Sequence, residues 1–321
     1  MNRIERVDAV LHGDPIDRPP FSFWFHFGNQ FGPGAKYAET VIDFFEYFEP
    51  DILKVMNDYH LPMPNSSKSI KTGEDLDRIV FVDPEQCDFV EQLRAIAAIC
   101  RRLNGAAYVI DTVFDPWQQL TKHLVGEFMP YVVRHFPNEL KRALHTMTEI
   151  VIAYCESMLA GGSDGVFLAV QASAELVGGK TIFEEFIMPP VLEVLDAIYG
   201  KGKVNTLHLC GENIYVDCIP RLRVPILSWA DRLPDNPTIA EMKKKFNGVA
   251  MCGIDHTALN RRTWESIETN VLTGLKNGGA ERFILAPGCS VPAEMDTNLL
   301  KRMSDLISRS SHCPGSVSSS G

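Results

Sequence analysis

One pattern recurs along the whole chain and limits the folds it can adopt: a short apolar run, then a longer amphipathic stretch. Eight runs rich in Val, Ile, Leu and Phe have the length of buried strands, and they cover residues 21–25, 51–56, 106–114, 165–170, 205–210, 225–230, 248–254 and 282–287. The helical candidates include residues 36–48, 85–103, 137–160, 183–199, 238–246 and 262–278. Because near-continuous apolar strands belong in a parallel sheet covered by helices, the pattern predicts an α/β fold with a (β/α)8 TIM barrel. A doubly wound open sheet is the alternative.

The composition favours one globular unit with a polar end. The 321 residues are 45% hydrophobic and 22% charged, which is enough apolar material for one large core. We therefore expect residues 1–309 to form a single barrel with an N-terminal helix. Residues 310–321, "SSHCPGSVSSSG", form a low-complexity segment for which we predict a flexible polar tail.

Charge and cysteine distribution argue against several classes of protein. The chain has 31 Lys and Arg against 41 Asp and Glu, a net charge of −10, and no run of Lys or Arg exceeds three residues. This argues against binding to nucleic acid or to a membrane surface. The N-terminus lacks the apolar core of a secretory signal, and no stretch is long enough to span a bilayer. Eight scattered cysteines show no disulfide framework, so we predict a reduced, cytoplasmic protein.

Reactive side chains follow most of the predicted strands. In a TIM barrel the active site forms at the carboxyl ends of the strands, where such residues would meet. They are Asp58, His60, Asp115, Gln171, Glu175, His208, Cys210, Asp231, Asp255, His256 and Cys289. We take Asp58, Asp115 and Asp231 as candidate catalytic residues, each able to act as an acid, a base or a substrate anchor. The structural alternative is that an aspartate after a strand caps the following helix.

The segment "TLHLCGEN" at residues 206–213 carries the strongest metal signal. Residues i and i+2 of a strand share a face, with Cα atoms about 7 Å apart, so His208 and Cys210 can converge on one ion. Cys289, at the mouth of the last predicted strand, can reach across the barrel to complete a set of one nitrogen and two sulfur donors. Such a set selects zinc and leaves the fourth position for substrate or for Asp231. The alternative is a buried histidine beside a buried cysteine.

Three segments of the chain resemble the uroporphyrinogen decarboxylase superfamily. The opening "ERVDAVLHGDPIDRPPFSFW" is similar to its N-terminal helix and first strand, and "FEPDILKVMNDY" also fits. The segment "FILAPGCSVPAEMDTNLLKRM" resembles its C-terminal strand, loop and helix. The similarity covers nearly the whole chain and implies a TIM barrel, in agreement with the strand count. The superfamily has two chemical branches, porphyrinogen decarboxylases and corrinoid-dependent methyltransferases.

The decarboxylase branch has an arginine-bearing segment that this chain lacks. In that branch an "RQAGRY"-like segment after the first strand supplies arginines to the substrate carboxylates. The stretch here reads "FHFGNQFGPGAKY" and contains no arginine. His26, Asn29 and Lys36 are poor replacements, because arginine offers a permanent charge and a bidentate fork. Decarboxylation of a porphyrinogen is therefore the second hypothesis, with Arg232 or Arg261 as charges from other loops.

The methyltransferase branch has a zinc motif that this chain matches. The motif is H-x-C followed far downstream by a second Cys, and its counterparts are His208, Cys210 and Cys289. The resemblance implies that these residues bind zinc, that zinc holds the acceptor as a thiolate, and that a corrinoid donates the methyl group. No segment resembles a cobalamin-binding domain, so we expect the corrinoid to arrive on a partner protein. We predict methyl transfer to a small-molecule thiol; a non-catalytic corrinoid- or tetrapyrrole-binding barrel is the third hypothesis.

Overall fold

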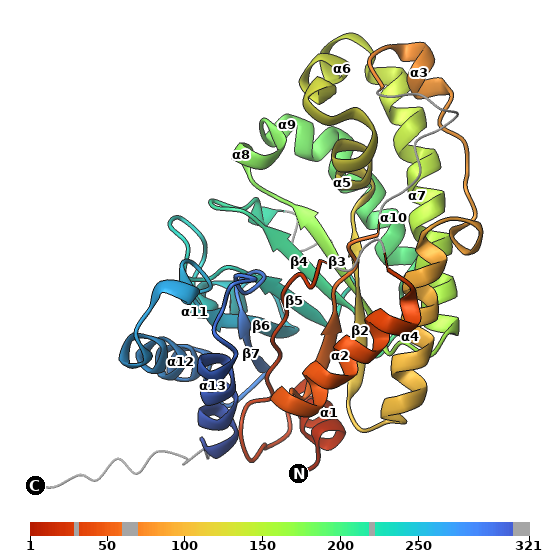
Figure 1. Ribbon diagram of the computed structural model, residues 1–321. Helices are drawn as coiled ribbons and strands as arrows, with labels where there is room; N and C mark the ends of the chain where they lie inside the picture. The colour runs from red at the N-terminus through yellow and green to blue at the C-terminus, as the bar shows by residue number, and fades with distance from the viewer. Residues whose placement is uncertain (29–31, 60–69, 218–221, 311–321) are drawn as a thin grey trace, which may run out of the picture.

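The computed structural model describes residues 1–28, 32–59, 70–217 and 222–310. Seven strands form one sheet, in which each strand pairs in parallel with the next along the chain. They are β1 (Ile52–Val55), β2 (Tyr108–Phe114), β3 (Gly165–Gln171), β4 (Thr206–Cys210), β5 (Ile226–Trp229), β6 (Val249–Ile254) and β7 (Phe283–Pro287). The unbroken order β1 to β7, with helices outside the curled sheet, confirms the predicted barrel fold over the doubly wound sheet (Figure 1).

An extended segment at residues 20–24 fills the eighth position of the barrel, between β7 and β1. Phe21 forms a parallel bridge with Leu285 of β7. The amide of Ser22 donates a hydrogen bond to the carbonyl of Leu285 at 3.1 Å. On the other side, the amide of Asp51 donates to the carbonyl of Phe21 at 2.9 Å. The segment therefore connects the two ends of the sheet.

The predicted strand at residues 21–25 is wrong as a regular strand, although its place between the first and last strands is right. Only one bridge forms there instead of a ladder. Pro19 and Pro20 precede the segment, and proline has no amide hydrogen to contribute to a ladder.

Helices cover the outside of the sheet. The α-helices are α1 (Arg3–His12), α2 (Gly34–Phe48), α3 (Gly73–Asp77), α4 (Phe89–Leu103), α5 (Pro116–Leu120), α6 (Met129–His135), α7 (Pro137–Ala160), α8 (Ala174–Val177), α9 (Lys180–Ile182), α10 (Met188–Ile198), α11 (Ile239–Lys243), α12 (Trp264–Gly278) and α13 (Thr297–Arg309). Short 3-10 turns lie at η2 (Pro84–Gln86), η4 (Gly126–Phe128) and η7 (Leu259–Arg261), and π turns at η3 (Thr121–Val125) and η5 (Phe183–Ile187). Among the described residues, no helix combines the length and apolar character needed to cross a membrane.

The predicted helices are confirmed with small shifts at their ends. Helix α7 has the predicted bounds, because Pro137 starts it and Gly161 follows its last residue. The predicted helix at 183–199 is the π turn η5 continued by α10. The helices at 116–135 were not among the predicted ones. The predicted tail lies outside the described residues from position 311 onward.

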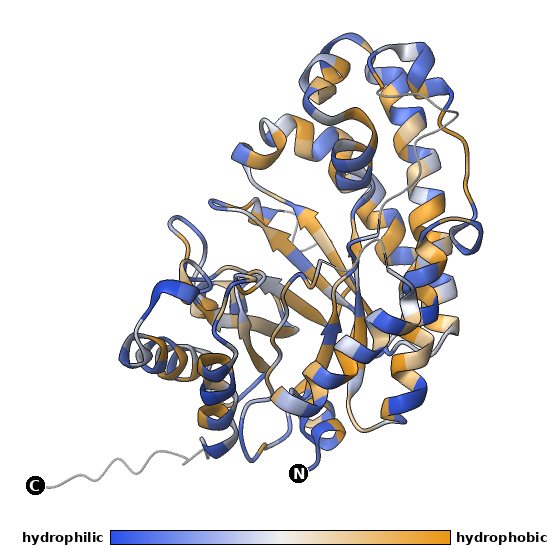
Figure 2. Ribbon diagram, viewed as in Figure 1, coloured by the Kyte–Doolittle hydropathy of each residue, from blue (hydrophilic) through white to orange (hydrophobic). Residues whose placement is uncertain are grey.

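The core has two layers, one inside the barrel and one between the strands and the helices. Inside, Ile110 and Met251 pack in one cluster with Val7 and Val10 of α1. Helix α1 therefore closes the end of the barrel where the strands begin, and Figure 1 shows it below the strands. Figure 2 shows hydrophobic residues along the strands and polar residues on the outer faces of the helices. This leaves the carboxyl ends of the strands as the open end.

Candidate metal centre

His208, Cys210 and Cys289 meet at the carboxyl end of the barrel. His208 and Cys210 lie on β4, and Cys289 follows β7 by two residues. One ligand atom from each side chain lies within 4.8 Å of the other two. Zinc with bonds of about 2.0–2.3 Å holds its donors roughly 3.6 Å apart, so small side-chain movements would suffice to bind it. The structure thus brings together the three residues that the sequence pattern selected.

Two neighbours fix the imidazole of His208. Its Nδ1 atom lies 3.1 Å from the hydroxyl oxygen of Ser228, the residue directly opposite it in the β4–β5 register. The ring of Phe167 stacks on it with centroids 5.4 Å apart. With Nδ1 engaged, Nε2 is the ring nitrogen that is free for a metal. A hydrogen bond to the ring nitrogen that does not face the metal is the usual means of orienting a metal-binding histidine.

The thiols of Cys210 and Cys289 form a hydrogen bond with each other. A hydrogen bond from Cys210 lowers the pKa of the Cys289 thiol, and His208 lowers it further. The same hydrogen bond, together with burial, raises the pKa of Cys210. Zinc binds cysteine as thiolate, so metal binding at this pair would release the thiol protons.

A small cavity of about 190 Å³ lies over these three residues. His256, Glu175 and Glu212 also line it, and the rest of the lining is Gly, Ala and Leu. Burial lowers the pKa of His256. A liquid water occupies about 30 Å³, so the cavity has room for a small organic molecule.

A buried lysine lies deeper in the barrel. Lys54 of β1 is 4% exposed, and its Nζ lies 4.5 Å from the centroid of the Phe167 ring and 5.1 Å from that of the Trp24 ring. Burial lowers the pKa of Lys54 to about 7, against the attraction of Cys289 and Asp111. The ring of Phe167 thus contacts both Lys54 and His208, and His208 lines the cavity.

Two candidate catalytic aspartates, Asp115 and Asp231, accept hydrogen bonds from backbone amides. Asp115 is fully buried and caps α5 by accepting a hydrogen bond from the amide of Gln118 at 3.1 Å, as in the structural alternative. Burial raises the pKa of Asp115 to about 6. Asp231 accepts a hydrogen bond from the amide of Gly253 at 2.8 Å, and burial raises its pKa to about 6. The group of close ligand atoms found among the described residues does not include Asp231.

The third candidate, Asp58, forms a pair with a histidine at the barrel mouth. Its Oδ1 atom lies 2.5 Å from Nδ1 of His26, and both side chains are partly exposed. His26 belongs to the aromatic segment that leaves the eighth position of the barrel. This pair has the composition of an acid–base dyad that solvent can reach.

The other reactive residues have different surroundings. Asp255 binds Thr257 and Arg262 by hydrogen bonds and an ion pair, which indicates a role in holding its own loop. Gln171 ends β3, and its Oε1 atom is buried with no hydrogen-bond partner among the described residues. His60 and Asn29 lie outside the described residues.

Among the residues that the structure describes, no arginine or lysine lines the cavity over the three metal-ligand candidates. Lys36 is exposed on α2, Arg261 is exposed on η7, and Arg232 donates weakly to the carbonyl of Gly253 at 3.5 Å. The described part of the cavity lining therefore lacks the compensating charges that a porphyrinogen decarboxylase would need.

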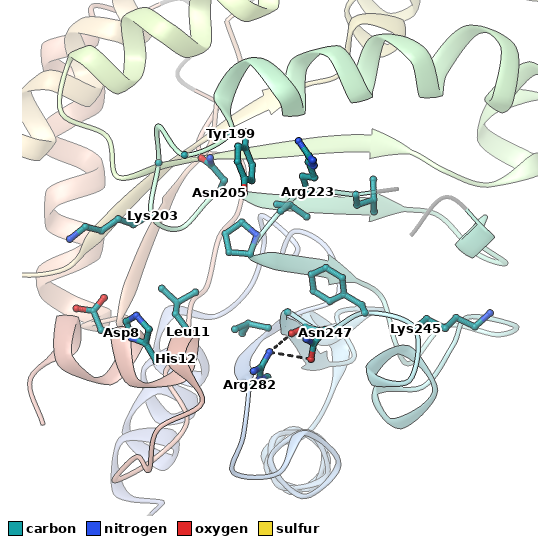
Figure 3. A pocket seen from close by; sticks show the side chains of 18 residues that line it. Asp8, Leu11, His12, Tyr199, Lys203, Asn205, Arg223, Lys245, Asn247 and Arg282 are labelled. Atoms are coloured by element: carbon teal, nitrogen blue, oxygen red, sulfur yellow. Dashed lines mark hydrogen bonds between the residues drawn. The ribbon is translucent and has the colours of Figure 1, made fainter. Parts of the chain in front are cut away.

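A larger cavity of about 920 Å³ lies at the opposite end of the barrel, around α1 and the segments that lead into β4, β5 and β6 (Figure 3). Figure 3 shows Lys203, Arg223, Lys245 and Arg282 spread around it on different elements. It contains none of the metal-ligand candidates. Because chemistry in TIM barrels takes place at the carboxyl ends of the strands, we assign the functional site to the smaller cavity despite its size.

The fold and the donor set together define a TIM-barrel protein with a candidate soft-metal centre at its open end. A model of the family described as uroporphyrinogen decarboxylase (URO-D) matches residues 53–310, and the chain belongs to this family.

Similar proteins include two from Methanosarcina mazei. The methylcobamide:CoM methyltransferase MtbA is 26% identical over 146 residues, 44% of this chain and 42% of MtbA. The match thus spans less than half of that relative. A methyltransferase from the same organism has a solved structure with a TM-score of 0.78 at 16% identity, covering 96% of this chain and 98% of the other. A B12-independent methionine synthase from Shewanella sp. W3-18-1 has a TM-score of 0.50 at 11% identity, with coverages of 67% and 64%. These structural similarities support the barrel fold.

Sequence reasoning missed two residues around the candidate metal centre. Ser228 is a single hydroxyl in the apolar run "PILSWA", and Lys54 is a single charge in "DILKVM". A polar residue in an otherwise apolar strand was the signal in both cases, since such a residue must find a partner when it is buried.

Proposed function

We propose that this protein is a zinc-dependent methyltransferase that moves a methyl group from a methylated corrinoid protein to a small thiol. The observation that carries the proposal is the convergence of one imidazole and two thiols beneath a cavity of about 190 Å³. Its support from relatives is the similarity to a protein named methylcobamide:CoM methyltransferase.

His208, Cys210 and Cys289 would hold the zinc, with Ser228 and Phe167 fixing the imidazole. Two thiolates and one imidazole satisfy three positions of a tetrahedral ion and leave the fourth for the acceptor. Bound zinc supplies the Lewis acidity that keeps the acceptor as a thiolate at neutral pH.

The acceptor sulfur forms a bond to the methyl carbon. The carbon–cobalt bond breaks with its electron pair left on cobalt, and the thiol proton is released. The cavity is small, so the methyl donor would approach its mouth from outside. We propose that a partner protein carries the corrinoid, because no segment of this chain resembles a cobalamin-binding domain. The protein supplies proximity and alignment for this step.

The three candidate aspartates, Asp58, Asp115 and Asp231, differ in their proposed roles. Asp58 with His26 at the mouth is the candidate that can accept the thiol proton and pass it to solvent. Asp231 would have to leave the amide of Gly253 to reach the fourth zinc position, so the proposal leaves that position to the acceptor. The candidate role of Asp115 is reduced to shaping the site, because it is fully buried and caps α5. The chemistry requires reduced thiols, which fits the proposed cytoplasmic location.

The experiment is an anaerobic assay of zinc-loaded protein with methylcobalamin as donor and a panel of small thiols. Loss of the methyl–cobalt absorption together with formation of the S-methyl product by mass spectrometry supports the proposal. The Cys100→Ala variant is the matched control, because Cys100 lies on α4, away from the site. Absence of product with every thiol, at full zinc content, contradicts the proposal. Release of CO2 from a porphyrinogen would instead establish the decarboxylase hypothesis.

A further inference from the structure

The cavity over the metal-ligand candidates has an unusual charge balance for a site that is to receive a thiolate. Besides the three ligands, the ionisable residues in its lining are Glu175, Glu212 and His256. Glu175 lies on α8 and Glu212 follows Cys210 by two residues, and both are exposed at the edge of the cavity. Neither forms an ion pair among the described residues. The cavity therefore presents two carboxylates to the part of the acceptor that lies beyond its sulfur.

The nearest cations do not offset these carboxylates within the cavity. Lys122 attracts Cys210, but its Nζ lies over the ring of Phe114 at 4.1 Å and it does not line the cavity. Lys54 attracts Cys289 from inside the barrel and does not line the cavity either. Lys54 is buried on β1, whereas Lys122 lies on η3, after the carboxyl end of β2. Neither lysine is part of the cavity lining.

The metal itself would add no positive charge once an acceptor is bound. Zinc with two cysteine thiolates has a net charge of zero, and a third thiolate makes the centre negative. A substrate whose far end also carries a negative charge would meet this centre and two carboxylates. A positive charge on the far end would be attracted to the negative centre and to the two carboxylates.

We propose that the acceptor is an aminothiol, with a positively charged amine at the end opposite its sulfur, and that Glu175 and Glu212 select it against thiols with a sulfonate or carboxylate end. This inference rests on the proposed methylation of a thiol at this site. The size of the cavity limits the acceptor to a short molecule. The apolar remainder of the lining contacts the carbon chain between sulfur and amine.

Three thiols with the same two-carbon chain differ in the charge of the end opposite the sulfur: cysteamine, 2-mercaptoethanol and 2-mercaptoethanesulfonate. Their dissociation constants are measured by calorimetry on zinc-loaded protein without any corrinoid, so that the readout does not depend on turnover. The variants are the double substitution Glu175→Gln with Glu212→Gln, and Glu193→Gln as a matched control. Glu193 is an exposed glutamate on α10 outside the cavity.

The quantity to compare is the ratio of the sulfonate Kd to the amine Kd in each protein, because the three thiols also differ in intrinsic acidity. We expect this ratio to fall by about tenfold in the double variant, the effect of removing nearby charge at partly exposed positions, and to stay constant in Glu193→Gln. The ratio in wild type should also shrink as salt is added. Zinc content is measured in every variant to show that the centre is intact.

An unchanged ratio in the double variant, or tighter binding of the sulfonate than of mercaptoethanol by wild type, would overturn the inference. If no thiol binds the zinc-loaded protein, the inference and the proposed function both fail. If thiols bind with the expected change but none is methylated, the charge selection stands and the proposed function alone fails.

Discussion

The Nδ1 atom of His208 lies 3.1 Å from the hydroxyl oxygen of Ser228, and the two residues are direct partners in the register of β4 and β5. The sheet itself therefore fixes which nitrogen of the imidazole faces the cysteines. Because the imidazole is already held in one orientation, it loses little rotational entropy when a metal binds. The arrangement links the packing of two barrel strands to the chemistry of the centre.

Replacing Ser228 by Ala should weaken zinc binding by about 10- to 100-fold, the usual effect of losing a hydrogen bond that orients a metal ligand. Zinc affinity is measured by competition with a coloured chelator. Ser304→Ala is the control, because Ser304 is also buried and hydrogen-bonded, to the carbonyl of Phe48, but lies on α13. Equal zinc affinities for both variants would show that Ser228 does not orient the imidazole.

Gly211→Ala should disturb the centre through the backbone. A Cβ at Gly211 would lie 2.4 Å from Oγ of Ser173, and φ at this residue is +121°, which favours glycine. The chain must shift directly after Cys210, so we expect at least about tenfold weaker zinc binding, a loss of about 1.4 kcal/mol. Gly105→Ala is the control, since Gly105 also has a positive φ of +80° but open space around it. If Gly211→Ala binds zinc as tightly as Gly105→Ala does, this account of Gly211 is contradicted.

The barrel and the convergence of His208, Cys210 and Cys289 could be predicted from the sequence because both depend on short-range patterns. Apolar runs such as 165–170 mark strands, and residues two apart on a strand share a face whatever the rest of the fold does. Cys289 could be added because parallel strands end at the same side of a barrel.

Other features depend on contacts between distant segments. Ser228 contacts His208 only because of the strand register, and no local pattern determines that register. Lys54 is stabilised by the rings of Trp24 and Phe167, which come from different parts of the barrel. For Asp115, the sequence allowed a catalytic role or a helix cap, and its burial and hydrogen bonds identify the cap.

Asp51→Asn should destabilise the protein strongly. The fully buried carboxylate of Asp51 binds Arg6 and Arg18, both at 2.6 Å, and accepts a hydrogen bond from the amide of Phe21 at 3.0 Å. It thus ties α1 and the eighth position of the barrel to β1. Removing one partner of a buried ion pair costs about 3–5 kcal/mol in the free energy of unfolding.

Urea denaturation at pH 7 measures this loss. The control is Glu46→Gln, which breaks an exposed ion pair with Arg102 at 3.0 Å and should cost less than about 1 kcal/mol. Similar losses in the two variants would contradict the structural role of Asp51.

Asp111 should make stability depend on pH. Burial raises the pKa of this carboxyl to about 7, although Tyr154 and Gln92 donate hydrogen bonds to it. The folded protein then keeps a proton that the unfolded chain loses near pH 4, so this group destabilises the fold progressively as the pH rises from about 4 to about 7. In Asp111→Asn the effect is absent, and the free energy of unfolding of the variant relative to wild type should rise over this range by up to about 1.4 kcal/mol per pH unit.

Urea unfolding of both proteins at pH 5, 6, 7 and 8 tests this dependence. The difference between the two proteins should rise up to about pH 7 and then level off. A constant difference from pH 5 to pH 8 would show that the carboxyl of Asp111 is not protonated in the folded protein.

Zinc content is the measurement that tests the central claim most directly. Anaerobically purified wild type and the Cys100→Ala control should each contain about one zinc per chain by elemental analysis. Cys210→Ala and Cys289→Ala should lose the metal while keeping the circular dichroism spectrum of the fold. Wild-type protein that holds no zinc, even after reconstitution, would contradict the metal centre and leave His208 and Cys210 as a buried pair.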